Sequence, residues 1–153
     1  MPGETCSPTR RRFLEVASVA TLAAWTVPRN AHAGGDETLK VGLIGCGGRG
    51  TGAAREALRA DRQAKLWAMA DVFPDRLALS MESLRQEDVV GQLDVTPERQ
   101  FIGFDAYRQV IECCDVVLLC TPPHFRPMHL EAAIDTGRHV FAEKPIAVDA
   151  PGV

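Results

Sequence analysis

The residues of this sequence best suited to chemistry lie in Gly137–Pro145. A glycine that can end a helix is followed by a short apolar run, which leads to Glu143, Lys144 and Pro145. In open α/β sheets ligands bind beyond the carboxyl ends of the strands, so Lys144 would lie where a substrate binds. Such a lysine can donate a proton to a substrate hydroxyl or accept one from it. The alternative is an ion pair between Lys144 and Glu143 in solvent.

A glycine-rich segment is the second group with recognisable chemistry: Gly45, Cys46, Gly47, Gly48, Arg49 and Gly50. It fits the dinucleotide pattern G-x-G-x-x-G, follows an apolar run and precedes a helix-forming segment. Gly45 would allow the tight turn, Gly47 the approach of a pyrophosphate, and Gly50 close packing of helix against strand. Free N–H groups at the start of the helix would bind phosphate. The alternative is a glycine-rich loop that holds no ligand.

Asp71 is expected to choose between the two nicotinamide dinucleotides. It lies 21 residues after Gly50, at the end of the next apolar run. A carboxylate at this place binds the ribose 2′-hydroxyl of NAD and repels the 2′-phosphate of NADP. Val72 and Phe73 follow it, and Arg76 is expected to face solvent, so no arginine is placed to bind that phosphate. The sequence therefore favours NAD over NADP.

Thr121, Pro122 and Pro123 end a further apolar run. The two prolines fix an extended turn, which could form a wall of the nicotinamide pocket or serve only as a rigid exit from the strand. The three histidines after residue 33 lack metal-ligand spacing and are expected to be surface or packing residues: His124, His129 and His139. No metal site is predicted.

Alternating strands and helices are needed to bring these residues together. Strands are expected at Leu39–Ile44, Ala64–Ala70, Phe101–Phe104, Val116–Cys120 and His139–Ala142. Helices are expected at Arg49–Ala60, Pro74–Arg85, Asp105–Glu112 (with Asp105 as N-cap) and Pro127–Thr136 (followed by Gly137). A polar loop is expected at Glu87–Gln100. This alternation predicts an α/β fold with a doubly wound parallel sheet and right-handed crossovers.

The first 33 residues are expected to be an export signal. Thr9–Leu14 resembles the twin-arginine signal, although Glu15 stands where that pattern has lysine. An apolar run at Val16–Val27 and the small-residue site Ala31–Ala33 complete the pattern. The run is too short to span a bilayer stably, which disfavours a membrane anchor, and the alternative is an ordinary N-terminal helix or tail. We expect the twin-arginine machinery to export the protein to the periplasm, with cleavage after Ala33, a linker at 34–38 and one domain at 39–153.

Composition excludes other kinds of partner and site. The formal net charge is −3, and no cluster of lysine and arginine follows the leader, so a nucleic-acid partner is not expected. Four cysteines after the leader lack zinc-finger spacing and are expected to be structural: Cys46, Cys113, Cys114 and Cys120. Proteins exported by the twin-arginine route fold first in a reducing compartment, so no disulfide framework is expected.

These motifs, in this order, resemble the N-terminal half of the Gfo/Idh/MocA oxidoreductases. The matching segments are Val41–Gly50, Ala70–Asp71, Phe104–Arg108, Asp115–Pro123 and Gly137–Pro145. The resemblance implies a Rossmann domain that binds NAD(P) and places Thr121, Pro122 and Glu143 beside the cofactor. It also implies that Lys144 lies near the nicotinamide and the substrate, and that the bond before Pro145 can be cis.

The sequence departs from this family at two places. Arg126 stands where the family often has histidine, five residues after the threonine of Thr-Pro. Family members also continue into an α+β domain that covers the nicotinamide, and here the sequence ends near the expected next helix at Asp149–Ala150. A truncated product is therefore expected, in which a family-like oligomer would need the missing domain.

The leading hypothesis is the NAD-binding domain of an exported dehydrogenase for CH–OH groups of a sugar or polyol derivative. On its own the chain would have little activity. One alternative is an NAD-dependent glycosidase of the same family, and another is a non-catalytic nucleotide-binding module. The residues leave the substrate, the direction of reaction and the oligomeric state open.

Overall fold

A single parallel sheet organises the part of the chain that the structure describes. The computed structural model describes residues 38–153, so the predicted export signal lies outside the described residues. Five strands pair in the order β3-β2-β1-β4-β5. Their bounds are β1 (Leu39–Ile44), β2 (Ala64–Asp71), β3 (Gln100–Ile102), β4 (Val116–Leu119) and β5 (His139–Ala142). The strand order reverses beside β1, which is the doubly wound Rossmann-type arrangement predicted from the sequence.

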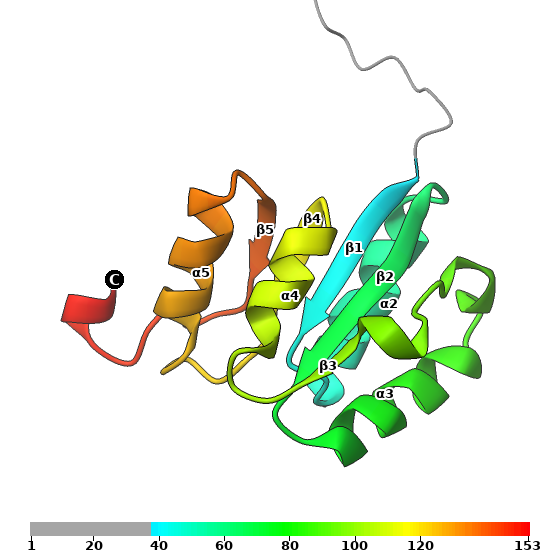
Figure 1. Ribbon diagram of the computed structural model, residues 1–153, viewed down its shortest axis with the longest axis horizontal. Coiled ribbons are helices and arrows are strands. Elements are labelled where there is room, and N and C mark those ends of the chain that lie inside the picture. The colour runs from blue at the N-terminus through cyan, green and yellow to red at the C-terminus, as the bar shows by residue number, and fades with distance from the viewer. Residues whose placement is uncertain (1–37) are drawn as a thin grey trace, which may run out of the picture. The chain divides into compact units, whose positions relative to one another are not determined.

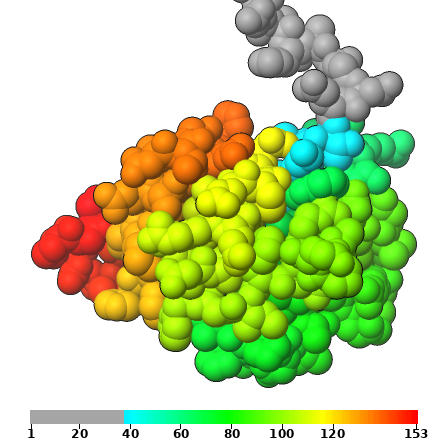
Figure 2. Space-filling model, viewed as in Figure 1, coloured from blue at the N-terminus to red at the C-terminus, as the bar shows by residue number. Residues whose placement is uncertain are grey.

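Two pairs of helices cover the two faces of the sheet (Figure 1). On one face lie α2 (Gly48–Ala60) and α3 (Pro74–Arg85), and on the other lie α4 (Ala106–Cys113) and α5 (Arg126–Asp135). In Figure 2, α4 and α5, which pack side by side, form the yellow-green to orange part of the near surface, and green segments that precede α4 form much of the rest. Single turns of 3₁₀ helix occur at Val90–Gln92, Pro97–Arg99 and Ala150–Gly152. Within residues 38–153, no helix is long and apolar enough to cross a membrane.

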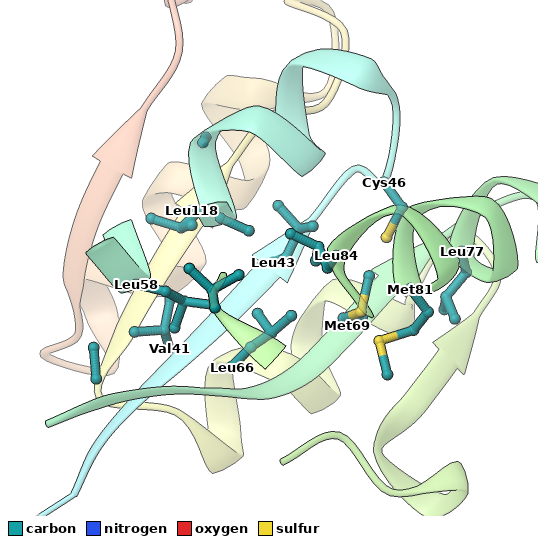
Figure 3. Packing of buried hydrophobic residues seen from close by; sticks show 14 residues of the cluster. Val41, Leu43, Cys46, Leu58, Leu66, Met69, Leu77, Met81, Leu84 and Leu118 are labelled. Carbon is teal, nitrogen blue, oxygen red and sulfur yellow. The ribbon is translucent and has the colours of Figure 1, made fainter. Parts of the chain in front are cut away.

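Side chains at alternate positions of the strands point to opposite faces of the sheet and pack into two hydrophobic layers. On β1, Val41 and Leu43 pack toward α2 and α3, where Leu58 and Met81 complete the cluster drawn in Figure 3. The opposite layer packs against α4 and α5. There Gly42 leaves no room for a side chain, because a Cβ on it would lie 2.4 Å from a methyl carbon of Val110. The two layers hold the sheet rigid and fix where its strands end.

Two local expectations need correction. The segment expected to be a polar loop, Glu87–Gln100, is anchored by apolar residues: Val89 is buried, and Leu93 pairs with Leu66 of β2. Asp105 does precede a helix, but its side chain does not cap it. The backbone of Asp105 is already helical, with φ −93° and ψ −1°, whereas an N-cap side chain reaches the helix from an extended backbone.

Candidate functional site

Three strands end level with one another at the carboxyl edge of the sheet. The register pairs Ile44 with Leu119, and Leu119 with Ala142. Backbone hydrogen bonds continue this alignment one residue further, from the N–H of Cys120 to the Ile44 carbonyl (2.8 Å) and from the N–H of Glu143 to the Leu119 carbonyl (3.0 Å). The glycine-rich loop, the Thr-Pro segment and the Glu-Lys-Pro segment therefore begin next to one another.

The glycines of the loop have two different environments. Gly45 has a φ of +97°, and a Cβ on Gly50 would lie 1.9 Å from the Gly45 carbonyl oxygen. Both positions thus require glycine for the turn and for packing of α2 against it. By contrast, a Cβ on Gly47 or Gly48 would meet no atom within 4 Å. These two residues border open space, which leaves room for a ligand against the backbone.

The N-terminus of α2 is open to an anion. Within the described part of the chain, no side chain caps this helix, and its first turn holds no acidic residue. Its first N–H groups have no partner within the helix, and the helix dipole adds partial positive charge there. The residues present therefore fit a pyrophosphate, which binds through backbone N–H groups at such a terminus.

Asp71 lies against this loop at the end of β2. Its carboxylate accepts hydrogen bonds from the backbone N–H of Cys46 (2.6 Å) and of Phe73 (3.0 Å). The thiol of Cys46 is turned into the core, where it lies 3.5 Å from the Ala70 carbonyl, and burial raises its pKa. Cys46 can therefore serve a cofactor only through its backbone, and its N–H is already bonded to Asp71.

A cavity of about 510 Å³ opens along the same edge. It is lined by five residues that the sequence predicted: Gly45, Gly47, Asp71, Thr121 and Pro122. Sequence reasoning did not assign its aromatic residues, which follow the ends of β2, β3 and β4: Phe73, Phe104, Tyr107 and Phe125. Arg76 is exposed as expected, but it also lines the cavity that holds Asp71, so it does not simply face away into solvent.

His129 forms part of the wall of this cavity. It is 5% exposed, its ring stacks on Tyr107 with centroids 4.2 Å apart, and its Nδ1 lies 3.2 Å from the hydroxyl of Thr121. Burial, helped by the charge of Arg108, lowers its pKa to about 4. It is thus a neutral packing histidine that steadies the Thr-Pro segment. No group of three metal-ligating side chains occurs among residues 38–153.

The Glu-Lys-Pro segment lies outside the lining of the large cavity. Glu143 is buried, and its carboxylate pairs with the guanidinium of Arg49, whose hydrogen bond holds the pKa of Glu143 below its ordinary value. The alternative pair between Glu143 and Lys144 is therefore not what the structure shows. Lys144 is exposed, and its bond to Pro145 is cis.

Comparison with known proteins agrees with this geometry. A model of the Gfo/Idh/MocA family, described as an oxidoreductase family with an NAD-binding Rossmann fold, matches residues 39–152. The inositol 2-dehydrogenase of Cereibacter sphaeroides is 34% identical over 115 residues, which are 75% of this chain and 30% of that protein. A glycosyl hydrolase family 109 protein of Shewanella pealeana is 24% identical over 160 residues, 91% of this chain and 34% of that protein.

The fold also matches solved structures of longer chains. An NAD-binding oxidoreductase from Klebsiella pneumoniae superposes with a TM-score of 0.56 at 26% identity, over 74% of this chain and 29% of that one. The chain thus spans about a third of the length of the relatives it matches. Because the family model covers nearly all of the described residues, this chain belongs to the Gfo/Idh/MocA oxidoreductase family, and residues 39–152 form its NAD-binding Rossmann domain.

Proposed function

We propose that this domain is the cofactor-binding part of a dehydrogenase that acts on CH–OH groups of a sugar or cyclic polyol. The observation that carries the proposal is the meeting, at one sheet edge, of an open phosphate loop, Asp71 and the Glu-Lys-Pro segment. Each supplies a different part of the chemistry. The similarity to an inositol 2-dehydrogenase supports a polyol as the class of substrate.

Each part of the edge has a role in the proposed site. The loop Gly45–Gly50 and the N-terminus of α2 hold the pyrophosphate of NAD, with Gly47 and Gly48 leaving it room. Asp71 accepts a hydrogen bond from the adenosine ribose, while Thr121 and Pro122 form the wall of the cavity. When bound, NAD supplies the acceptor for the hydride of the substrate carbon. Lys144, exposed beside this edge, takes the hydroxyl proton on oxidation and returns it on reduction.

The preference for NAD over NADP is also a proposal, and it rests on Asp71. Its carboxylate lies at the loop, and like charge repels a 2′-phosphate. Arg76 borders the same cavity and would attract that phosphate, which weakens the discrimination without reversing it. Calorimetric titration of the chain with each dinucleotide tests this, and tighter binding of NADP than of NAD would contradict it.

The dehydrogenase activity is tested in the protein that carries this domain. Purified protein is incubated with NAD and with inositols or free sugars, and formation of NADH is followed by absorbance. We expect turnover that Lys144→Ala lowers at least about a hundredfold, since general acid–base catalysis contributes roughly 10²–10⁴-fold. Binding of NAD without any redox activity or glycoside cleavage would instead indicate a nucleotide-binding module.

An NAD-dependent glycosidase is the second candidate, and the similarity to a glycosyl hydrolase family 109 protein favours it. In such an enzyme a transient oxidation of the sugar would activate the glycosidic bond, and NADH would not accumulate. Aryl glycosides with NAD therefore separate the two candidates. Release of the aryl group without net NADH formation would replace the dehydrogenase by the glycosidase.

Export to the periplasm is proposed from the sequence of residues 1–33. The test replaces Arg10 and Arg11 by lysine and follows the protein by cell fractionation and N-terminal sequencing. We expect the wild type to begin at Gly34 in the periplasm and the double variant to stay unprocessed in the cytoplasm. Arg12→Lys, at the variable position of the motif, is the matched control and should be exported normally.

A further inference from the structure

Arg126 connects the two segments on either side of the proposed reaction centre. It is the first residue of α5 and is only 4% exposed. Its Nη2 donates to the carbonyl oxygen of Thr121 (2.6 Å), and its Nη1 donates to the carbonyl oxygen of Pro145. The side chain thus bridges the exit of β4 and the residue directly after Lys144.

Both acceptors of Arg126 are main-chain oxygens, so the bridge fixes backbone rather than side-chain positions. Hydrogen bonds from a charged donor are stronger than neutral ones, and the planar guanidinium can reach two acceptors in fixed directions. The single ring of a histidine could not offer two donors from one fork in this way.

A second arginine binds the residue that precedes Lys144 in the sequence. Arg49, in the first turn of α2, pairs with the buried carboxylate of Glu143. Lys144 lies between two residues that are each held by an arginine from a different helix. Its own side chain is exposed, so its placement depends on how its backbone is fixed.

We infer that Arg126 is a positioning residue for Lys144, which it keeps at the carboxyl edge beside the cofactor cavity. The inference rests on the proposed function, since it assigns the lysine to a reaction with bound NAD. Arg126 itself does not line the cavity, but it donates a hydrogen bond to Thr121, which does.

The experiment measures ¹⁵N relaxation of the 153-residue chain with and without NAD. The variant Arg126→Gln removes the fork, and Arg126→Lys keeps the buried charge with a single ammonium, which provides a second variant if the first does not fold. Arg138→Gln is the matched control. Arg138 also donates to a main-chain oxygen, that of Glu112 (2.9 Å), but it precedes β5 at the opposite edge of the sheet.

We expect the order parameter of the Lys144 amide to fall from about 0.85, typical of rigid backbone, to below about 0.6 in the Arg126 variants. The control Arg138→Gln should leave this order parameter unchanged. An unchanged order parameter in both Arg126 variants overturns the inference, while NAD binding by the wild type keeps the proposed function. A wild type that does not bind NAD overturns the proposed function and the positioning role with it.

Discussion

The glycine-rich loop and the Glu-Lys-Pro segment meet at one sheet edge but are held in place by different means. The loop is shaped by its own backbone, through the positive φ of Gly45 and the contact of Gly50 with it. The Glu-Lys-Pro segment is held by side chains that come from elsewhere, Arg49 of α2 and Arg126 of α5. The conformation of the loop is therefore set by residues close together in the sequence. The conformation of the Glu-Lys-Pro segment depends on tertiary contacts with residues far away in the sequence.

The largest expected effect on stability comes from adding a side chain at Gly50 of the glycine-rich loop. Gly50→Ala places a Cβ 1.9 Å from the Gly45 carbonyl oxygen, so α2 must move away from the turn. We expect a loss of about 3 kcal/mol or more in the free energy of unfolding, measured by urea denaturation, because overpacking at backbone cannot relax cheaply. Gly52→Ala is the control in the same helix, where a Cβ meets nothing within 4 Å. If Gly50→Ala and Gly52→Ala had the same free energy of unfolding, close packing at Gly50 would not determine the conformation of the loop.

Asp71→Asn tests the chemistry of the loop rather than its shape. Asparagine can still accept from the Cys46 N–H, but it lacks the charge that strengthens a bond to the ribose. We expect the Kd for NAD to rise roughly 10- to 150-fold, which corresponds to a loss of about 1.5–3 kcal/mol, and the Kd for NADP to fall. Asp75→Asn, on the first turn of α3 and outside the cavity, should change neither value in calorimetry.

The pH dependence of stability tests whether His129 is buried in the cavity wall, beside the Thr-Pro segment that lies between the two regions. Its pKa is about 4 in the folded chain and near 6.5 when unfolded, so the unfolded state binds more protons between these values. Stability from this group is therefore complete above pH 6.5 and falls as the pH drops toward 4. The loss amounts to about 2 kcal/mol between pH 7 and pH 5. His129→Gln should remove this slope in urea denaturation, whereas His139→Gln, at an exposed position, should keep it.

The smallest expected effect concerns the ion pair that holds the Glu-Lys-Pro segment. Arg49→Gln removes the hydrogen bond and charge that lower the pKa of Glu143, so this carboxyl should titrate at higher pH. Carbon-detected NMR of the Glu143 carboxyl measures the change. Arg55→Gln, whose partners are Glu87 and Glu56, should leave it unaltered. An identical titration in all three proteins would mean that Arg49 does not hold the segment in solution.

The same contrast explains which features could be predicted from the sequence. The strands, the parallel sheet and the roles of Gly45 and Gly50 in the turn follow from local patterns, and the structure has them. The pair of Arg49 and Glu143 joins residues 94 positions apart, and no sequence pattern links them. The side-chain cap predicted at Asp105 is absent for a similar reason, because a local pattern does not determine the helical backbone that Asp105 adopts before α4.

The cavity wall was predicted only in part for a related reason. Thr121 and Pro122 could be singled out from the sequence because they end a strand, and in the structure they line the cavity. Tyr107 and His129 lie near the N-termini of α4 and α5, and side chains of this kind within helices most often pack in the core. Only the crossing of α4 and α5 over the sheet stacks these two rings beside the Thr-Pro segment.

The most direct test of the account is a titration of ¹⁵N-labelled chain with NAD, followed by NMR. We expect saturable shifts at the amides of Gly47 and Gly48, at Asp71, at Thr121 and at Lys144, and none at Arg138. This pattern would place the loop, the ribose carboxylate and the lysine around one bound cofactor. Shifts at the loop that leave Lys144 unmoved, or no saturable shift at all, would contradict the proposed site.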